Sequence, residues 1–464
     1  MAKILFFNPP SRRSVYLETN VRVGAPSYPN LTLAALAGNL VKDHSVKIAD
    51  LDLCADPVAA LLLELEAFKP DMVASSANTP NYYATRELMT AVKEKYPGIR
   101  TVLGGVHATT MPEEVSAEKC FDVVVLGEGD TVIPELLSRD ASGVPGIIYK
   151  DAAGAAVRTA PRDRISDING LPFPAWELFR LDRYKNSRLS SRKNPVGLIE
   201  TSRGCAFQCN YCNKKIFGSS FRVKSPSRVV AEMAHMLRIG FREIHIIDDS
   251  FTQDIARAKE ICAEILSQGL KFPWSLFNGI RVDTVDMEFL TLAKKAGLWQ
   301  VAFGIETGDE EVLKRINKRI TLEQTGRAIR MAKTADLDTF GFFILGLSGE
   351  TELSMQKTIA FAKTLPLDMA KFDICIPYPG TPYYQELKAQ GRIKTENWAR
   401  YICHQTDEPL FEHPNLAWPV ITRYYKKAFR EFYLRPSFFL SRFLRSLRKG
   451  DLLYDIQYFF KTKW

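Results

Sequence analysis

Three closely spaced cysteines are the feature that most limits what this chain can fold into. Cys205, Cys209 and Cys212 follow one another with the spacing C-x3-C-x2-C. Thiolates this close together cannot be three independent core residues, but they can hold three irons of a [4Fe–4S] cluster and leave the fourth iron without a protein ligand. An iron with an open position can bind and reduce a substrate or cofactor, whereas a fully ligated cluster only passes electrons.

A zinc site that takes its fourth ligand from elsewhere is the alternative. Structural zinc sites usually pair two short Cys/Cys or Cys/His elements, and this sequence has no second pair. The remaining cysteines are scattered singly and are expected to be small buried residues: Cys54, Cys120, Cys262, Cys375 and Cys403. The spacing therefore favours an iron–sulfur cluster over zinc.

The composition is that of a globular protein of two to four domains, with 464 residues, 46% hydrophobic and 25% charged. Cysteine use of this kind fits a reducing compartment better than a disulfide scaffold. The apolar stretch at the N-terminus is too short for a signal peptide, and no apolar run reaches the roughly 18 residues of a membrane span. We therefore expect a cytoplasmic protein.

Residues 1–140 alternate between strand-like and helical segments. Strands are expected at 3–7, 46–51, 71–75, 101–103 and 121–126, and helices at 31–41 and 81–95. Such alternation predicts an α/β domain with a doubly wound, Rossmann-like parallel sheet, whose ligand lies beyond the carboxyl ends of the strands. Asn8-Pro9-Pro10 follows the first strand in place of G-x-G-x-x-G, which disfavours a dinucleotide.

A second region in which strand-like and helical segments alternate extends over 196–385. It follows a proline-rich connector at 141–195. Six strands are expected, at 196–200, 243–247, 274–278, 299–305, 339–345 and 371–376. Helices are expected between them, at 227–238, 286–295, 322–333 and 352–363. This pattern predicts a partial (β/α)6 barrel with its chemistry at the carboxyl ends of the strands, where the cysteine loop follows the first strand. A helical C-terminal region at 386–464 completes the expected organisation.

Cysteines with this spacing after the first strand of a β/α series resemble the radical S-adenosylmethionine (SAM) superfamily. The resemblance implies that the open iron chelates the amino and carboxylate groups of SAM and that electron transfer yields methionine and a 5′-deoxyadenosyl radical. It assigns Cys205, Cys209 and Cys212 to the cluster. It places these residues near SAM: Tyr211 at the adenine, Asp248 and Asp249 at the amino group, Arg281 at the carboxylate, Glu306 at the ribose and Gly346 near the adenine.

The N-terminal region is similar to the corrinoid-binding domain of the cobalamin-dependent subgroup of this superfamily. Three short segments carry the similarity and imply these cobalamin-binding residues: Ser75, Ser76, Asn78, Gly104, Gly105, His107, Gly127, Glu128 and Gly129. The motif D-x-H-x-x-G, whose histidine ligates cobalt, is absent. The resemblance therefore implies cobalamin bound without a protein histidine on cobalt.

Four functions follow from this resemblance, and the first is favoured. It is methylation of an unactivated carbon, or of phosphorus, in a small metabolite, which one interpretation takes to be apolar. A flavodoxin- or ferredoxin-type donor would supply the electrons. The second keeps the cofactors but closes a ring or oxidises without methyl transfer, as in the anaerobic cyclase of chlorophyll synthesis. An RNA methylthiotransferase needs three cysteines in its N-terminal domain, where only Cys54 and Cys120 lie. A non-catalytic carrier does not explain the complete set of barrel segments.

The tail carries almost all of the net charge. Residues 421–464 hold eleven basic, three acidic and thirteen aromatic residues, so this segment contributes +8 of the total +9. Within it, Leu440, Phe443, Leu444 and Leu447 recur at helical spacing, with Arg442, Arg445, Arg448 and Lys449 on the other face. Three interpretations stay open: a lid on the barrel, a peripheral contact with the inner face of an anionic membrane, or, least favoured, an RNA-binding segment.

Overall fold

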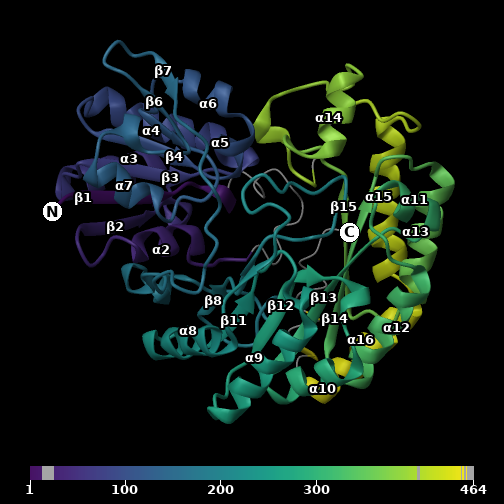
Figure 1. Ribbon diagram of the computed structural model, residues 1–464. Helices are drawn as coiled ribbons and strands as arrows, with labels where there is room; N and C mark the ends of the chain where they lie inside the picture. The colour runs from purple at the N-terminus through teal and green to yellow at the C-terminus, as the bar shows by residue number, and fades with distance from the viewer. Residues whose placement is uncertain (13–25, 405–407, 451, 454–455, 457–464) are drawn as a thin grey trace.

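Two large β-sheets, one mostly and one entirely parallel, form the molecule together with their helices (Figure 1). The computed structural model describes residues 1–12, 26–404, 408–450, 452–453 and 456, and all structural statements concern these residues. The tail prediction for 421–464 therefore lies outside the described residues at 451, 454–455 and 457–464.

The first sheet has the strand order β2-β1-β3-β4-β5-β6-β7. Its five parallel strands confirm the five predicted ones: β1 (Lys3–Asn8), β2 (Ser45–Asp50), β3 (Met72–Ser76), β4 (Arg100–Gly104) and β5 (Val123–Val125). β6 (Ile147–Lys150) and β7 (Ala156–Arg158) then extend the sheet in antiparallel fashion. The sequence analysis missed both, because two short strands joined by a tight turn leave too few residues for a clear period.

Helices connect these strands in the doubly wound manner. The order β2-β1-β3 reverses direction at β1, and right-handed crossovers in opposite directions place their helices on opposite faces. The helices are α2 (Leu31–Gly38), α3 (Pro57–Phe68), α4 (Tyr82–Lys95), α5 (Val106–Thr110), α6 (Pro112–Ala117) and α7 (Val132–Ser138). Local sequence fixes their starts; for example, Asp56 accepts the Ala59 N–H as the N-cap of α3, and Pro57 follows it.

The second sheet contains the six predicted parallel strands, and the structure arranges them in the order β15-β14-β13-β12-β11-β8. They are β8 (Val196–Ile199), β11 (Glu243–Ile246), β12 (Trp274–Ile280), β13 (Leu298–Glu306), β14 (Asp338–Leu345) and β15 (Met369–Ile374). Among the described residues β8 and β15 do not pair, so the barrel is partial. The outer helices are α8 (Pro226–Ile239), α9 (Ile255–Ser267), α10 (Met287–Lys295), α11 (Glu310–Arg315), α12 (Leu322–Thr334) and α13 (Glu352–Thr364).

Aromatic contacts identify the outer face of the barrel strands. The ring of Phe372 in β15 stacks on that of Phe343 in β14, with 5.1 Å between centroids, and it also meets Phe429 and Phe432 of a C-terminal helix. Because side chains alternate along a strand, Phe340 and Phe342 of β14 point to the opposite, inner face. The barrel lumen is thus lined by aromatic side chains.

The C-terminal region adds α14 (Pro382–Ala389), α15 (Trp418–Tyr433) and α16 (Pro436–Lys449). α15 packs on the barrel through its apolar face, with Ile421, Ala428 and Phe432 fully buried. This contact fits the lid interpretation for α15, but several large apolar side chains of α16 are exposed. No helix in the described part of the chain is both long and apolar enough to cross a membrane.

Candidate functional site

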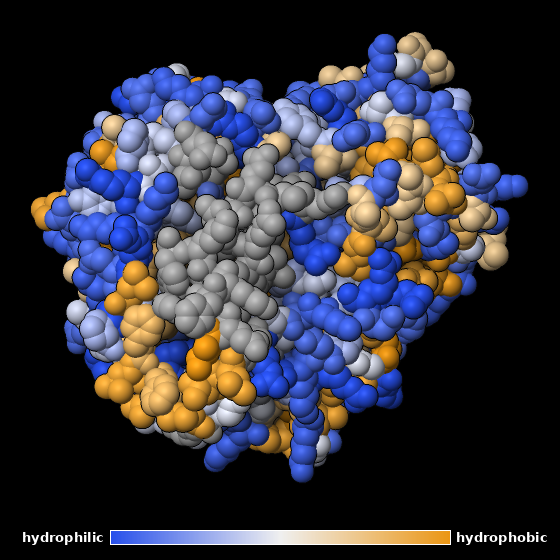
Figure 2. Space-filling view, turned by 180° about the vertical axis from the view of Figure 1, so that it is seen from behind, coloured by the Kyte–Doolittle hydropathy of each residue, from blue (hydrophilic) through white to orange (hydrophobic). Residues whose placement is uncertain are grey.

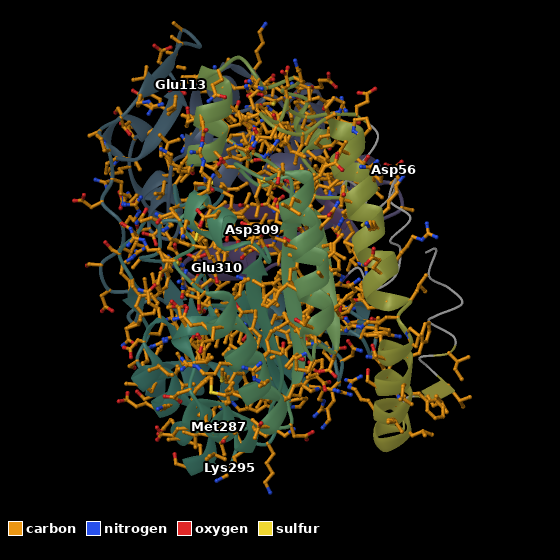
Figure 3. All side chains as sticks on the ribbon, turned by 90° about the vertical axis from the view of Figure 1, so that its right-hand side faces the viewer. Asp56, Glu113, Met287, Lys295, Asp309 and Glu310 are labelled. Carbon is orange, nitrogen blue, oxygen red and sulfur yellow. The ribbon has the colours of Figure 1, made fainter. Side chains whose placement is uncertain are left out.

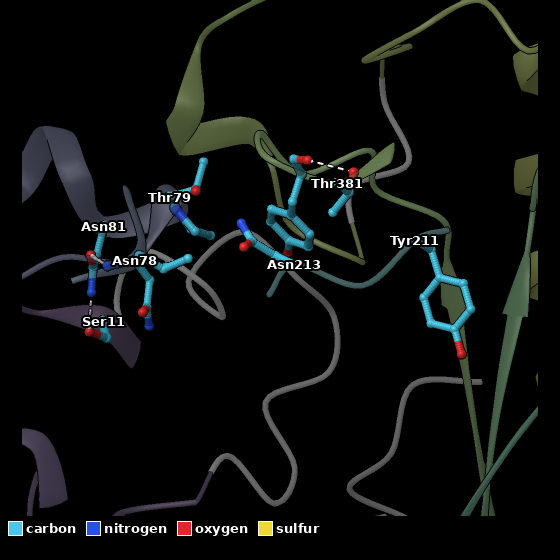
Figure 4. A pocket seen from close by; sticks show the side chains of 10 residues that line it. Ser11, Asn78, Thr79, Asn81, Tyr211, Asn213 and Thr381 are labelled. Atoms are coloured by element: carbon cyan, nitrogen blue, oxygen red, sulfur yellow. Dashed lines mark hydrogen bonds between the residues drawn. The ribbon is translucent and has the colours of Figure 1, made fainter. Parts of the chain in front are cut away.

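A cavity of about 310 Å³ lies where the carboxyl ends of the two sheets face each other (Figure 4). The first domain contributes Ser11, Asn78, Thr79, Pro80, Asn81 and Val106, and the barrel contributes Tyr211, Asn213, Tyr378 and Thr381. The structure therefore brings Asn78, predicted to contact cobalamin, into one space with Tyr211, predicted to contact SAM. Its amide and hydroxyl groups supply the donors and acceptors that a corrin ring with amide side chains requires.

Main-chain contacts hold the cysteine loop, which leaves the barrel after β8. Two short antiparallel strands close its base, β9 (Ser202–Arg203) and β10 (Arg222–Val223). Gly204 has φ 86°, and a Cβ there would lie 2.3 Å from the Ser220 carbonyl oxygen, so only glycine fits. Lys214 Nζ donates to the Cys205 carbonyl oxygen at 2.9 Å. The loop is shaped without using the cysteine side chains.

None of the three cysteine residues is fully buried. Cys205 and Cys209 are half-buried and Cys212 is exposed. Desolvation by the surrounding chain raises the pKa of Cys212 to about 12, and the neighbouring thiolates of Cys209 and Cys205 contribute to this rise. Three thiolates that repel one another need a compensating cation, which an iron–sulfur cluster supplies. Of the other cysteines, Cys54 and Cys403 are half-buried, and these three are buried as expected: Cys120, Cys262 and Cys375.

Asp248 and Asp249 follow β11 and meet the start of the cysteine loop. Asp248 is buried and accepts the Thr201 N–H at 2.6 Å, the Thr201 hydroxyl at 2.5 Å and the Ser202 hydroxyl at 2.6 Å. Asp249 is exposed and, within the described part of the chain, accepts a hydrogen bond only from the Gly204 N–H, at 3.2 Å. Asp248 thus positions the loop, whereas Asp249 retains the capacity to accept from an ammonium group. Their predicted contact with SAM stays a prediction.

Arg281 supports the cysteine loop. Its guanidinium lies 3.7 Å from the ring centroid of Phe207, a residue of the loop. It donates from Nε and Nη2 to Asp283 at 2.9 and 2.8 Å, and from Nη1 to the Lys318 carbonyl oxygen at 2.8 Å. These bonds leave little donor capacity for a ligand. The structure therefore gives Arg281 a packing role, and its contact with the SAM carboxylate stays a prediction.

Tyr211 and Glu306 are brought together through a lysine that the sequence analysis did not select. Lys318 Nζ donates to Glu306 at 2.7 Å and to the Tyr211 hydroxyl at 3.3 Å. Desolvation and the Glu306 carboxylate raise the pKa of Tyr211. Glu306, the last residue of β13, has φ 68°, a left-handed conformation that non-glycine residues adopt at a cost and that clusters at functional sites.

Gly346 forms the turn after β14. Its N–H donates to Glu350 at 2.6 Å, and the Leu347 N–H donates to the same oxygen at 3.1 Å. Burial raises the pKa of Glu350 to about 8. Gly346 has φ 81°, so a glycine is favoured at this turn. The structure places Gly346 at the carboxyl face of the barrel, and its contact with SAM stays a prediction.

The predicted cobalamin residues at the end of β3 and in the loop after it differ in accessibility. Ser75 is buried and donates from its hydroxyl to the Phe7 carbonyl oxygen at 2.9 Å, which ties β3 to β1. Ser76 is half-buried. Asn78 is exposed at the cavity, and its backbone N–H donates to Asn81 Oδ1 at 2.8 Å. Of these three, only Asn78 lines the cavity.

The Gly104-Gly105 turn after β4 approaches the β3 loop closely. Gly105 has φ 96°, and a Cβ there would lie 2.6 Å from Ser76 Oγ, so the approach requires glycine. His107 is fully buried, with its ring 4.2 Å from Tyr82 and 5.4 Å from Trp398. Burial lowers the pKa of His107 to about 3. A neutral, enclosed imidazole fits cobalamin bound without a protein histidine on cobalt.

The Gly127–Gly129 loop contacts the barrel through Glu128. Gly127 has φ 83°, and nothing lies within 4 Å of the position that its Cβ would take. Glu128 is buried and accepts from Arg203 at 3.0 Å, from Arg222 at 2.9 Å and from the Ile165 N–H at 2.8 Å. The structure thus uses Glu128 for an ion pair between the domains, and its predicted contact with cobalamin stays a prediction.

Arg203 joins the two cofactor loops and was missed from the sequence. It directly precedes Gly204 at the start of the cysteine loop. Besides Glu128, its buried guanidinium contacts Asp130 at 2.9 Å and Glu200 at 2.6 Å. Its place beside the first cysteine is a sequence signal, but two of its three carboxylate partners, Asp130 and Glu128, lie 73 and 75 residues away and only the fold reveals them.

Comparisons with known proteins agree with this arrangement. Residues 199–362 match the Radical SAM superfamily and residues 19–137 match the B12 binding domain. An uncharacterized methyltransferase of Pyrococcus horikoshii is 33% identical over 94% of this chain and 93% of its own length. An anaerobic magnesium-protoporphyrin IX monomethyl ester cyclase of Cereibacter sphaeroides is 30% identical over 82% of this chain, which spans 64% of that protein.

Two solved structures share the fold. The radical S-adenosylmethionine methyltransferase TsrM from Kitasatospora setae, with cobalamin and a [4Fe–4S] cluster bound, has a TM-score of 0.71 and 20% identity over 94% of this chain and 90% of its own. The cobalamin-dependent S-adenosylmethionine radical enzyme OxsB, with aqua-cobalamin bound, has a TM-score of 0.74 and 16% identity over 91% of this chain and 65% of its own.

The first sheet, the partial barrel and the cysteine loop together define the class of radical enzymes in which SAM binds at an iron–sulfur cluster. The chain belongs to the cobalamin-dependent radical SAM family, with methyltransferase-like relatives. Its cofactors are accordingly a [4Fe–4S] cluster, SAM and cobalamin.

Proposed function

We propose that this enzyme methylates an unactivated carbon, or a phosphorus, of a small hydrophobic metabolite. The observation that carries the proposal is the aromatic lining of the lumen. The rings of Phe340 and Phe342 lie 4.8 Å apart, Phe277 of β12 lies 6.3 Å from Phe340, and His245 stacks on Phe277 at 5.6 Å. Phe277, Phe340 and Phe342 are only half-buried, so they retain apolar surface for a ligand.

The place of the cavity, between the first domain and the barrel, suits a substrate held between two cofactors. One SAM would supply the 5′-deoxyadenosyl radical at the cluster, and cobalamin would supply a methyl group taken from a second SAM. Overall, one substrate C–H bond becomes C–CH3, and two SAM and two electrons yield methionine, 5′-deoxyadenosine and S-adenosylhomocysteine. The electrons would come from a flavodoxin- or ferredoxin-type donor. This chain's part is to position the reactants, which contributes much of the catalysis in such reactions.

Relatives support methyl transfer, and they also supply the second candidate. Among them are a cytidylyl-2-hydroxyethylphosphonate methyltransferase of Streptomyces wedmorensis, 29% identical, and a hopanoid C-3 methylase of Methylococcus capsulatus, 26% identical. The cyclase of Cereibacter sphaeroides favours a reaction that uses the same cofactors without methyl transfer. The two candidates differ in one product, because only methyl transfer forms S-adenosylhomocysteine.

A product assay separates the candidates before the substrate is known. The full chain, reconstituted anaerobically with iron, sulfide and hydroxocobalamin, is reduced and given SAM with a deuterated methyl group. Methyl transfer predicts labelled methyl in the corrinoid fraction and a matching amount of S-adenosylhomocysteine, both lost when cobalamin is omitted. Formation of 5′-deoxyadenosine and methionine without S-adenosylhomocysteine would reject the methyltransferase and support the cyclase-type reaction.

A further inference from the structure

α16 turns its apolar face to the solvent and its polar face to the protein, which is the reverse of the usual orientation for a helix on a globular protein. Leu440, Phe443, Leu444 and Leu447 form one stripe of the helix and are 61%, 48%, 57% and 53% exposed. Ser446, on the other side, is buried. An amphipathic helix normally turns its apolar stripe to the core, so this stripe has another role.

The polar side of α16 is the side that packs on the barrel. Arg445 forms ion pairs with Asp338, the first residue of β14, and with Asp368 at 3.7 Å. Arg192 also pairs with Asp338. Four arginines and two aspartates line this contact: Arg188, Arg192, Arg442, Arg445, Asp338 and Asp368. The ion pairs fix the rotation of the helix, and this rotation turns its apolar stripe outward.

α15 adds a basic stripe beside the apolar one. Its apolar face is buried on the barrel, while Arg423, Lys426, Lys427 and Arg430 are exposed at helical spacing. Arg423 and Lys427 have acidic partners, Glu352 and Glu431, but no ion pair joins Lys426 or Arg430 to another described residue. Unneutralised positive charge therefore lies next to an exposed apolar surface.

Both helices follow one side of the molecule, α15 above and α16 below (Figure 3). Seen from behind the view of Figure 1, hydrophobic side chains gather over the lower part of the barrel side, the region in which Figure 1 labels α16 (Figure 2). Because α16 contacts the first residue of β14, it lies at the amino ends of the barrel strands. The cofactor cavity is at the carboxyl ends, so a partner bound to α16 would leave this cavity uncovered.

We propose that α16 docks this protein on the surface of an anionic lipid bilayer. Its apolar stripe would enter the boundary between head groups and acyl chains, and the basic stripe of α15 would contact the head groups. RNA is a poorer partner, because Arg442 and Arg445 line the cluster against the barrel and apolar side chains are presented instead. A second copy of this chain would present the same basic stripe and so would not neutralise Lys426 and Arg430. The proposal is independent of the reaction catalysed.

Vesicle flotation tests this surface on the reconstituted full chain. We expect wild-type protein to float with vesicles of phosphatidylglycerol and phosphatidylcholine, at least tenfold more than with phosphatidylcholine alone, and to be released in part by salt. Leu444→Glu should reduce flotation at least tenfold, and Lys426→Glu with Arg430→Glu should remove the preference for anionic vesicles. The matched control is Leu63→Glu on α3, another exposed leucine (67%) far from the tail, which should float like wild type. Iron content and circular dichroism verify that each variant is folded.

Three results would overturn the proposal. One is wild-type protein that stays below the vesicles at all lipid concentrations. Another is an equal loss of flotation in Leu63→Glu and Leu444→Glu. The third is a concentration-dependent dimer, or binding to polyuridylic acid, that Leu444→Glu abolishes while vesicles bind neither protein. Retained flotation with the loss limited to the Leu444 variant supports docking by α16.

Discussion

The cysteine loop of the barrel and the loops of the first sheet face one cavity, yet they present their predicted residues in opposite ways. All three cysteines are accessible, whereas Ser75, His107 and Glu128 are buried in protein contacts. Cluster ligands must reach the metal with their own atoms, so their spacing is visible in the sequence. The loops of the first sheet instead depend on close backbone approach, as at Gly105, and on a few exposed groups such as Asn78.

The largest effect that this comparison predicts is a selective loss of the cluster. Cys205→Ala should remove the bound iron and lower the formation of 5′-deoxyadenosine by at least ~10³-fold, since the ligands act as a unit. Cobalt retention should stay close to that of wild type, because no cysteine of the loop takes part in the first sheet. Iron, sulfide and cobalt analysis of the reconstituted variant measures both. Loss of cobalt together with iron would show that the two loops are not independent.

Arg203 is where the two regions are joined, so its removal should affect both. Arg203→Leu leaves Glu128, Asp130 and Glu200 without their shared cation and should cost about 3–5 kcal/mol of unfolding free energy. Urea unfolding measures this change, and we expect lower iron and cobalt contents in the same protein. Arg180→Leu breaks an exposed pair with Asp182 and is the matched control, which should unfold at the same urea concentration as wild type. Equal effects of the two substitutions would contradict the role assigned to Arg203.

His107 should make the folding stability of the first domain depend on pH. Its folded-state pKa of about 3 lies below the usual value of 6.5, so the stability it contributes is present above pH 6.5 and is lost as the pH falls from there toward 3. Between pH 7 and pH 5 the unfolding free energy of wild type should fall by about 2 kcal/mol from this group alone. His107→Gln should lose that much less over the same interval in urea unfolding. Parallel curves for the two proteins would reject a buried neutral imidazole.

The smallest effects should distinguish Ser75, near the end of β3, from Asn78, in the loop that follows it. Asn78→Ala removes an exposed side chain at the cavity and should weaken cobalamin retention about tenfold, while stability changes by less than about 0.5 kcal/mol. Ser75→Ala removes a buried hydrogen bond and should do the reverse, with about 1 kcal/mol of stability lost and cobalamin retained. Equilibrium dialysis with hydroxocobalamin and urea unfolding distinguish them. The opposite ranking would place Ser75, not Asn78, at the cofactor.

Periodicity allowed most of the fold to be predicted, and tertiary contacts explain what it missed. All eleven predicted strands exist, because alternation and turn residues are local properties. β6 and β7 were missed for lack of a period. Asp248 and Arg281 lie at the predicted strand ends, but the sequence could not show that Thr201 and Asp283 already occupy their polar atoms. Such partners are distant in the chain or depend on rotamers, so a motif locates a residue without revealing what it contacts.

The amphipathic pattern of α16 shows the same limit. Its apolar stripe was evident from Leu440, Phe443, Leu444 and Leu447, but a stripe by itself does not say whether it faces the core or the solvent. That direction depends on Asp338 and Asp368, which come from β14 and the segment before β15 and attract Arg445. Only the tertiary structure therefore distinguishes a lid from an outward-facing surface.

By itself the sequence determined the two alternating α/β regions and the family, and it predicted the three cluster ligands, because spacing and periodicity are properties of neighbouring residues. The tertiary structure decided which predicted residues reach the cavity, that Arg203 and Lys318 belong to the site, and which way α16 faces. Those outcomes depend on burial and on ion pairs between distant segments, such as Arg203 with Asp130 and Lys318 with Glu306. Long-range electrostatic and packing contacts have no signature in a single sequence, since either partner alone is an ordinary charged residue.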